Sequence, residues 1–166
     1  MTRTSLAEAL EFLPQAILTS LQQENNPEGL LKDVETIVMG RDRASIADIP
    51  LVWIIEDNVE PIKHSIGANN IEFINARYEF YAINQDPDDV EESNKISREL
   101  AVRIGMTIEK QCKKQLYNNE RFFDNIKFQG LYNVPNDIEG SSKTVTQSCI
   151  VYNFMIRRNR LYCGNI

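Results

Sequence analysis

The residues of this chain that could do chemistry are carboxylates around two expected strands. Glu56, Asp57 and Glu60 follow a short apolar run, and Glu72 and Glu79 lie in the next run along the chain. Metal-dependent nucleases gather such carboxylates at strand ends to hold a catalytic ion. They also need a lysine beside the strand carboxylate, and neither Glu72 nor Glu79 is followed by one. We therefore expect no enzyme, and a small metal-dependent cytoplasmic enzyme using Glu56 and Glu72 is the alternative from another class.

Few other residues could serve as metal ligands, catalytic groups or cofactor-binding motifs. His64 is the single histidine and lies in a polar stretch, which is too little for a metal site built from several converging ligands. Cys112, Cys149 and Cys163 have no CxxC spacing, which favours reduced thiols. No GxGxxG, GxxxxGK or Gly-x-Ser-x-Gly pattern is present. The sequence thus predicts no catalytic, cofactor-binding or metal-binding residues.

Composition narrows the class of protein further. At 166 residues the chain fits one domain, 1–166, with a hydrophobic core of its own. The net charge of −6 argues against a protein that coats nucleic acid, which needs a positive field. No apolar run is long enough for a membrane span, and the first residues do not read as a signal peptide.

The N-terminal segment, 1–40, is expected to be helical. Ser5–Gln22 carries leucines at helical spacing, with a kink or break at Pro14 because proline removes a backbone donor. A second helix is predicted over Gly29–Met39, ended by Gly40.

Two strands are expected next. Leu51–Ile55 is apolar at consecutive positions, which predicts a strand covered on both faces, and Asp57–Asn70 reads as a loop. Ile71–Gln85 alternates as a long strand, with Arg77 and Glu79 on its more polar face. At about 3.3 Å per residue it would reach roughly 40–50 Å, so we expect it to extend past its partner as an arm or bent ribbon.

One long amphipathic helix is predicted over Pro87–Leu116. Asp86 is the expected N-cap, and Asp88 and Asp89 complement the positive end of the helix dipole. Its buried arc is expected to comprise Val90, Ile96, Leu100, Ala101, Ile104, Gly105, Ile108, Cys112 and Leu116. Gly105 beside Ala101 indicates a close contact between helix and sheet.

Two more strands, Asn125–Val134 and Thr144–Arg157, complete the sheet-and-helix core, 50–157. The fold class is therefore α+β: a mainly antiparallel four-stranded sheet with helices packed on one face, in the order α-α-β-β-α-β-β. A basic C-terminal tail, 158–166, follows.

The charged groups predict an interface between copies. Arg157, Arg158 and Arg160 form a basic cluster on a chain of negative net charge. The cluster is predicted to contact an acidic neighbour, for which the Asp86–Glu92 run of another subunit is a candidate; a solvated terminus is the alternative.

This order of elements resembles the tail terminator (tail completion) proteins of long-tailed bacteriophages, including those with contractile tails. The resemblance is carried by Ile49–Ile55, by Ile71–Ile83 with the acidic-capped helix after it, and by Phe128–Tyr132 with Thr144–Arg157. It covers roughly residues 30–157 and includes no active-site residues.

The resemblance implies a structural virion protein made in the host cytoplasm. Six copies would form a homohexameric ring at the head-proximal end of the tail. That ring would stop tube polymerisation and join the tail tube, and the sheath of a contractile tail, to the neck or connector protein. Six chains of −6 would carry −36 around a channel through which DNA passes without specific binding, and no cofactor or membrane is implied. Another phage neck or head-completion subunit is the nearer alternative.

Overall fold

The computed structural model describes residues 6–40, 49–62, 71–86, 88–134 and 145–159. Its elements are α1 (Leu6–Gln22), β1 (Thr36–Met39), β2 (Leu51–Pro61), β3 (Ile71–Gln85), α2 (Val90–Gln111), the 3-10 turn η2 (Cys112–Lys114), β4 (Leu116–Tyr117), β5 (Glu120–Arg121), β6 (Phe123–Val134) and β7 (Val145–Asn159). Within these residues, no helix is both long and apolar enough to cross a membrane.

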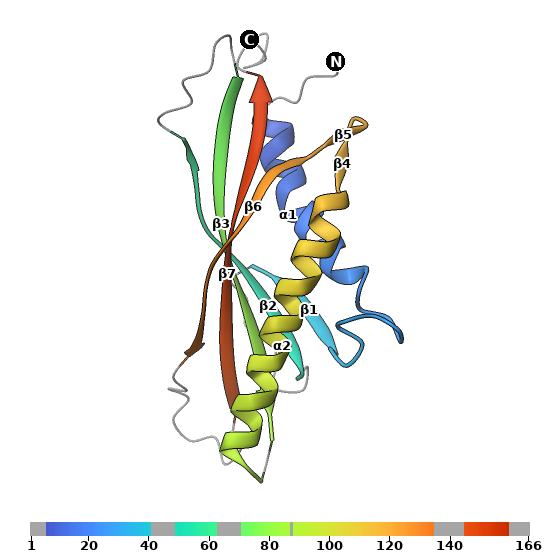
Figure 1. Ribbon diagram of the computed structural model, residues 1–166, viewed down its shortest axis with the longest axis vertical. Coiled ribbons are helices and arrows are strands. Elements are labelled where there is room, and N and C mark those ends of the chain that lie inside the picture. Colours follow the sequence, from blue (N-terminus) through green and yellow to red (C-terminus); the bar gives the residue numbers. More distant parts are fainter. Residues whose placement is uncertain (1–5, 41–48, 63–70, 87, 135–144, 160–166) are drawn as a thin grey trace.

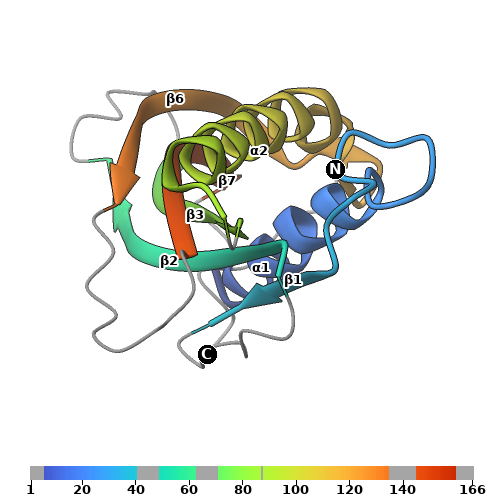
Figure 2. The same cartoon turned by 90° about the horizontal axis from the view of Figure 1, so that it is seen from below.

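The main sheet has five strands in the order β1-β2-β3-β7-β6. β1 runs parallel to β2, and every other neighbouring pair is antiparallel. Both helices lie on one side of this sheet, and the sheet curves around them (Figures 1 and 2). The α+β class with a mainly antiparallel sheet is thus confirmed, while the four-stranded sheet and the expected element order are wrong because β1 replaces a helix.

The core lies between the sheet and the helices. Alternate residues of β3 point toward the helices and are buried, as the period of two predicts. Among them Tyr78 packs edge-on against Phe154 of β7 at 5.8 Å between ring centroids, and its hydroxyl donates to the Glu56 carboxylate. The largest fully buried side chains are Tyr78, Phe80, Phe123, Phe154, Leu13, Ile17, Leu21, Leu31, Ile54, Leu100, Ile104 and Ile108.

β3 has the predicted bounds but not the predicted free end. All 15 of its residues pair with β7, from Ile71 opposite Asn159 to Gln85 opposite Val145. A free arm is therefore wrong, because β7 is as long as β3 and satisfies its backbone along the whole length, although β3 does extend past β2, which pairs only with Ile74–Ile83.

β2 is longer than its apolar run. It continues to Pro61 through a bulge between Glu56 and Asn58, so Asp57–Pro61 is strand where a loop was predicted. This half of β2 pairs with β3 on one side, but on the other side it extends beyond the last residue of β1. Its side chains are therefore polar, as in a loop, although its backbone forms a strand. The remainder of the predicted loop, 63–70, lies outside the described residues.

The helix predicted over Gly29–Met39 is wrong. Turns occupy this stretch up to β1, whose sequence Thr-Ile-Val-Met is rich in β-branched residues. Such residues prefer strands, and β1 gains backbone hydrogen bonds by pairing with β2.

The preceding helix, α1, continues without a break through Pro14. Leu13, Ala16, Ile17 and Leu21 are buried around that position, so packing outweighs the lost backbone donor.

α2 is shorter than predicted at both ends. Its N-cap is Asp89, not Asp86, and Pro87 lies outside the described residues. The Asp86 carboxylate instead accepts the Asp88 N–H at 3.0 Å, a local turn that delays the helix. At the far end, Leu116 belongs to β4. The predicted buried arc holds from Leu100 to Cys112.

Two ion pairs connect the turns between α1 and β1 to α2. Glu24 lies 2.6 Å from Lys110 Nζ, and it accepts hydrogen bonds from Gln111 at 2.7 Å and from the Leu30 N–H at 3.1 Å. Arg103 of α2 donates to both carboxylate oxygens of Asp33, at 2.6 and 3.0 Å. These contacts replace the helix that the sequence suggested there.

Candidate assembly surfaces

Arg77 and Glu79 lie on the face of β3 that carries no helix, here called the open face. Arg77 forms an ion pair with Asp57 of β2 at 3.0 Å between Nε and Oδ2. The Tyr81 hydroxyl donates to Glu79 at 2.7 Å. The structure therefore brings the two predicted residues together on one face, and each already has a partner within the chain.

The open face also carries an apolar cluster that sequence reasoning did not place. Leu51, Ile83 and Val145 are buried there, with Trp53 and Tyr81 packed against them. The Trp53 and Tyr81 rings lie 5.6 Å apart, and Trp53 donates its indole N–H to the Gly40 carbonyl at 2.6 Å. Its sequence signals were the uninterrupted apolar run of β2 and the apolar Tyr81 and Ile83 on the more polar face of β3.

Cys149 is opposite Tyr81 in the ladder between β3 and β7, and burial raises the pKa of its thiol to about 12. Cys149 is therefore a protonated packing residue at neutral pH.

The acidic residues gather at the start of α2. The Asp89 carboxylate accepts the N–H groups of Glu91 at 2.9 Å and Glu92 at 3.3 Å, which caps the helix. Asp88, Asp89, Glu91 and Glu92 are all exposed. We call Asp86–Glu92 the acidic end.

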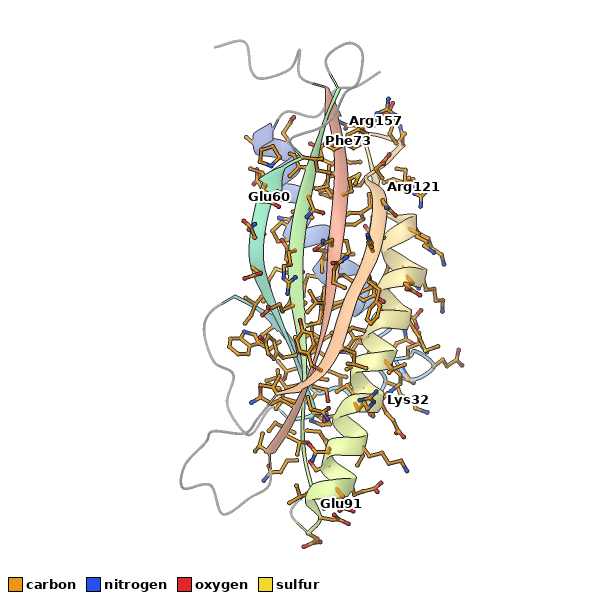
Figure 3. All side chains as sticks on the ribbon, turned by 60° about the vertical axis from the view of Figure 1, so that its left-hand side comes forward. Lys32, Glu60, Phe73, Glu91, Arg121 and Arg157 are labelled. Atoms are coloured by element: carbon orange, nitrogen blue, oxygen red, sulfur yellow. The ribbon has the colours of Figure 1, made fainter. Side chains whose placement is uncertain are left out.

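Two arginines lie toward the other end of the molecule, where Figure 3 also places Glu60. Arg157 is exposed near the end of β7. Arg158 is opposite Glu72 in the ladder, but its side chain and the whole of Arg160 lie outside the described residues. Arg121 of β5 lies at the same end as Arg157 (Figure 3), and we call this pair the basic end.

Sequence reasoning missed Arg121 because it lies in a short hairpin. The turn residues Asn118 and Asn119 both have positive φ, 51° and 63°, which suits a two-residue hairpin. Phe12 of α1 anchors the hairpin, with its ring 4.9 Å from Tyr117 and 4.7 Å from Phe122. The Asn-Asn pair was the available signal.

The two charged ends are far apart in one copy. Figure 3 shows Arg121 and Arg157 at one extremity of the long axis and Glu91 at the other. Each end also exposes one large apolar side chain, Val90 beside the carboxylates at 54% and Leu116 opposite Arg121 at 58%. These groups can therefore meet only between copies.

The carboxylates considered for catalysis are divided between the faces of the sheet. Glu56 reaches Tyr78 on the helix side, whereas Glu79 lies on the open face. The side chain of Glu72 and all of His64 lie outside the described residues. Among the residues that are described, no three His, Cys, Asp or Glu side chains gather to hold a metal ion.

Comparison with known proteins identifies no relatives: no family model matches the chain, and no curated protein does so either.

Proposed function

We propose that this chain is a structural subunit of a ring, of the tail terminator kind, that caps a phage tail tube and joins it to the neck or connector. The observation that carries the proposal is the separation of complementary groups on one elongated subunit. The acidic end with Val90 and the basic end with Leu116 lie at opposite extremities. A contact between unlike surfaces repeats from copy to copy and closes into a ring when its rotation permits.

A long pair of strands gives the subunit a continuous scaffold between its two ends. β3 and β7 pair over their whole length, and α2 runs alongside them (Figure 1). An end-to-end contact therefore has a defined direction, which closed symmetry requires. The proposed partners are a second copy, the tail tube and sheath, and the neck protein, in the virion.

The first prediction concerns assembly. We expect the purified chain, alone or on isolated tail tubes, to form six-fold rings, measured by mass photometry and negative-stain imaging. Binding to the connector with no binding to tube ends would favour the neck-subunit alternative. A chain that stays monomeric and leaves both tubes and connectors unbound would refute the proposal.

The second prediction tests the ends themselves. Reversing Arg157, Arg158 and Arg160 to glutamate should weaken assembly at least about tenfold, because two acidic surfaces then face each other. Reversing Asp88, Glu91 and Glu92 to lysine should do the same.

Mixing these two variants should restore assembly, since each altered end meets an oppositely charged one. The copies would then alternate, which a six-membered ring allows because six is even. The matched control reverses Lys32 and Lys127, which lie away from both ends. Restored assembly in the mixture is the expected result. If each reversed variant formed normal rings by itself, the contact between the acidic end and the basic end would be refuted. The proposal that the chain forms a ring would still stand.

A further inference from the structure

α2 is anchored to the sheet in two different ways along its length. From Leu100 to Ile108 its buried residues are mostly apolar. From Val90 to Glu99 its only buried residues are Ser93 and Ser97. The first part of the helix therefore buries no apolar side chain fully.

A row of hydroxyl groups holds this first part on β7. Ser93 Oγ lies 2.7 Å from Thr146 Oγ1 and accepts the Asp86 N–H at 3.2 Å. Ser97 Oγ lies 3.2 Å from Ser148 Oγ, and each of these hydroxyls has a second acceptor: the Asn94 carbonyl oxygen, 3.0 Å from Ser97 Oγ, and Asn133 Oδ1, 3.2 Å from Ser148 Oγ. All four hydroxyl residues are buried, so the row forms a polar seam between helix and sheet.

This polar seam stabilises the packing of the helix on the sheet less than an apolar contact would. A hydrogen bond between neutral groups adds little net stability, because water replaces it on opening. Burial of one leucine or isoleucine side chain adds about twice as much. Val90–Glu99 has only part of that second contribution, from the half-buried Ile96, while the following turns bury Leu100, Ile104 and Ile108 fully.

We infer that Val90–Glu99 is a latched segment that opens from the sheet as a unit, while α2 from Leu100 onward stays packed. The latch is the seam of Ser93, Ser97, Thr146 and Ser148. Opening moves the carboxylates of the acidic end together, because Asp89 caps the same segment. The inference depends on packing alone and holds whether or not the chain forms a ring.

Native-state hydrogen exchange tests the latch on the intact chain. Amides of Asn94–Glu99 should exchange about 100-fold faster than those of Ile104–Ile108, with little dependence on low denaturant. The amides of Ile104–Ile108 should instead follow global unfolding. Equal protection of both parts would overturn the inference.

A variant separates the seam from helix propensity. The variant carries S93A, T146V, S97A and S148A together, which replaces both members of each hydroxyl pair by apolar groups. Exchange of the Asn94–Glu99 amides should then slow at least about tenfold. The control, N94A, raises helix propensity at an exposed position and leaves the seam intact. Equal slowing by N94A would show that fraying of the helix end, not the seam, sets the exchange.

Discussion

Replacing Gly105 by leucine is expected to lower the free energy of unfolding by about 3 kcal/mol or more. A Cβ atom at this position would lie 2.7 Å from Ile150 Cδ1 and 3.0 Å from the Tyr152 hydroxyl oxygen. Both atoms are ends of side chains on β7, an interior strand, so a leucine must displace these buried side chains or lift α2 from the core. Gly105→Ala should cost less, since alanine favours helix by about 1 kcal/mol.

Equilibrium denaturation measures this effect, with Met106→Leu as the control at the adjacent, exposed position. The control should change stability by less than about 0.5 kcal/mol. A Gly105→Leu protein as stable as the wild type would contradict the close approach of helix and sheet.

Replacing Glu24 by alanine is expected to lower the free energy of unfolding by about 2–3 kcal/mol. The side chain is only 7% exposed and accepts hydrogen bonds from Gln111 and Leu30 while pairing with Lys110. Removing the Glu24 carboxylate leaves the donors of Gln111, Leu30 and Lys110 unpaired. It also removes a contact that holds the turns before β1 against α2. Lys110 itself is half exposed, so water offsets part of the loss. Thermal or chemical denaturation gives the value, with the exposed Glu28→Ala as control.

The same carboxylate makes stability depend on pH. Its hydrogen bonds with Lys110, Gln111 and Leu30 lower the pKa of Glu24 from 4.5 to about 2. Because the folded state holds the proton less tightly, the stabilisation is complete above about pH 4.5 and is lost as the pH falls toward 2. Glu24→Gln should therefore lose less stability than the wild type between pH 5 and about 2.5. Parallel curves for the two proteins over this range would argue against the lowered pKa.

Local pattern was enough to predict the elements that pack against the core. Alternation gave the bounds of β3, and helical spacing placed Leu100 to Cys112 in one buried arc. These residues carry their own periodicity, so no distant partner is needed to recognise them.

Elements that depend on distant partners were missed. The turns before β1 are held by Gln111 and Arg103, 87 and 70 residues away from the groups they bind, and no local signal reveals such contacts. β1 likewise needs β2 as its neighbour. For the surfaces, the sequence shows Arg157 and the Asp86–Glu92 run as charge clusters, but only the folded hairpin brings Arg121 toward the same end as Arg157.

The full-length pairing of β3 with β7 has a mechanical consequence. A pull between the two ends of the β3–β7 pair runs along these strands, and their hydrogen bonds lie across that direction. The load would fall on the whole ladder in shear, so many hydrogen bonds would resist together. Peeling one strand sideways would instead break them one after another. The ladder is thus expected to resist a pull along its strands better than a pull across them.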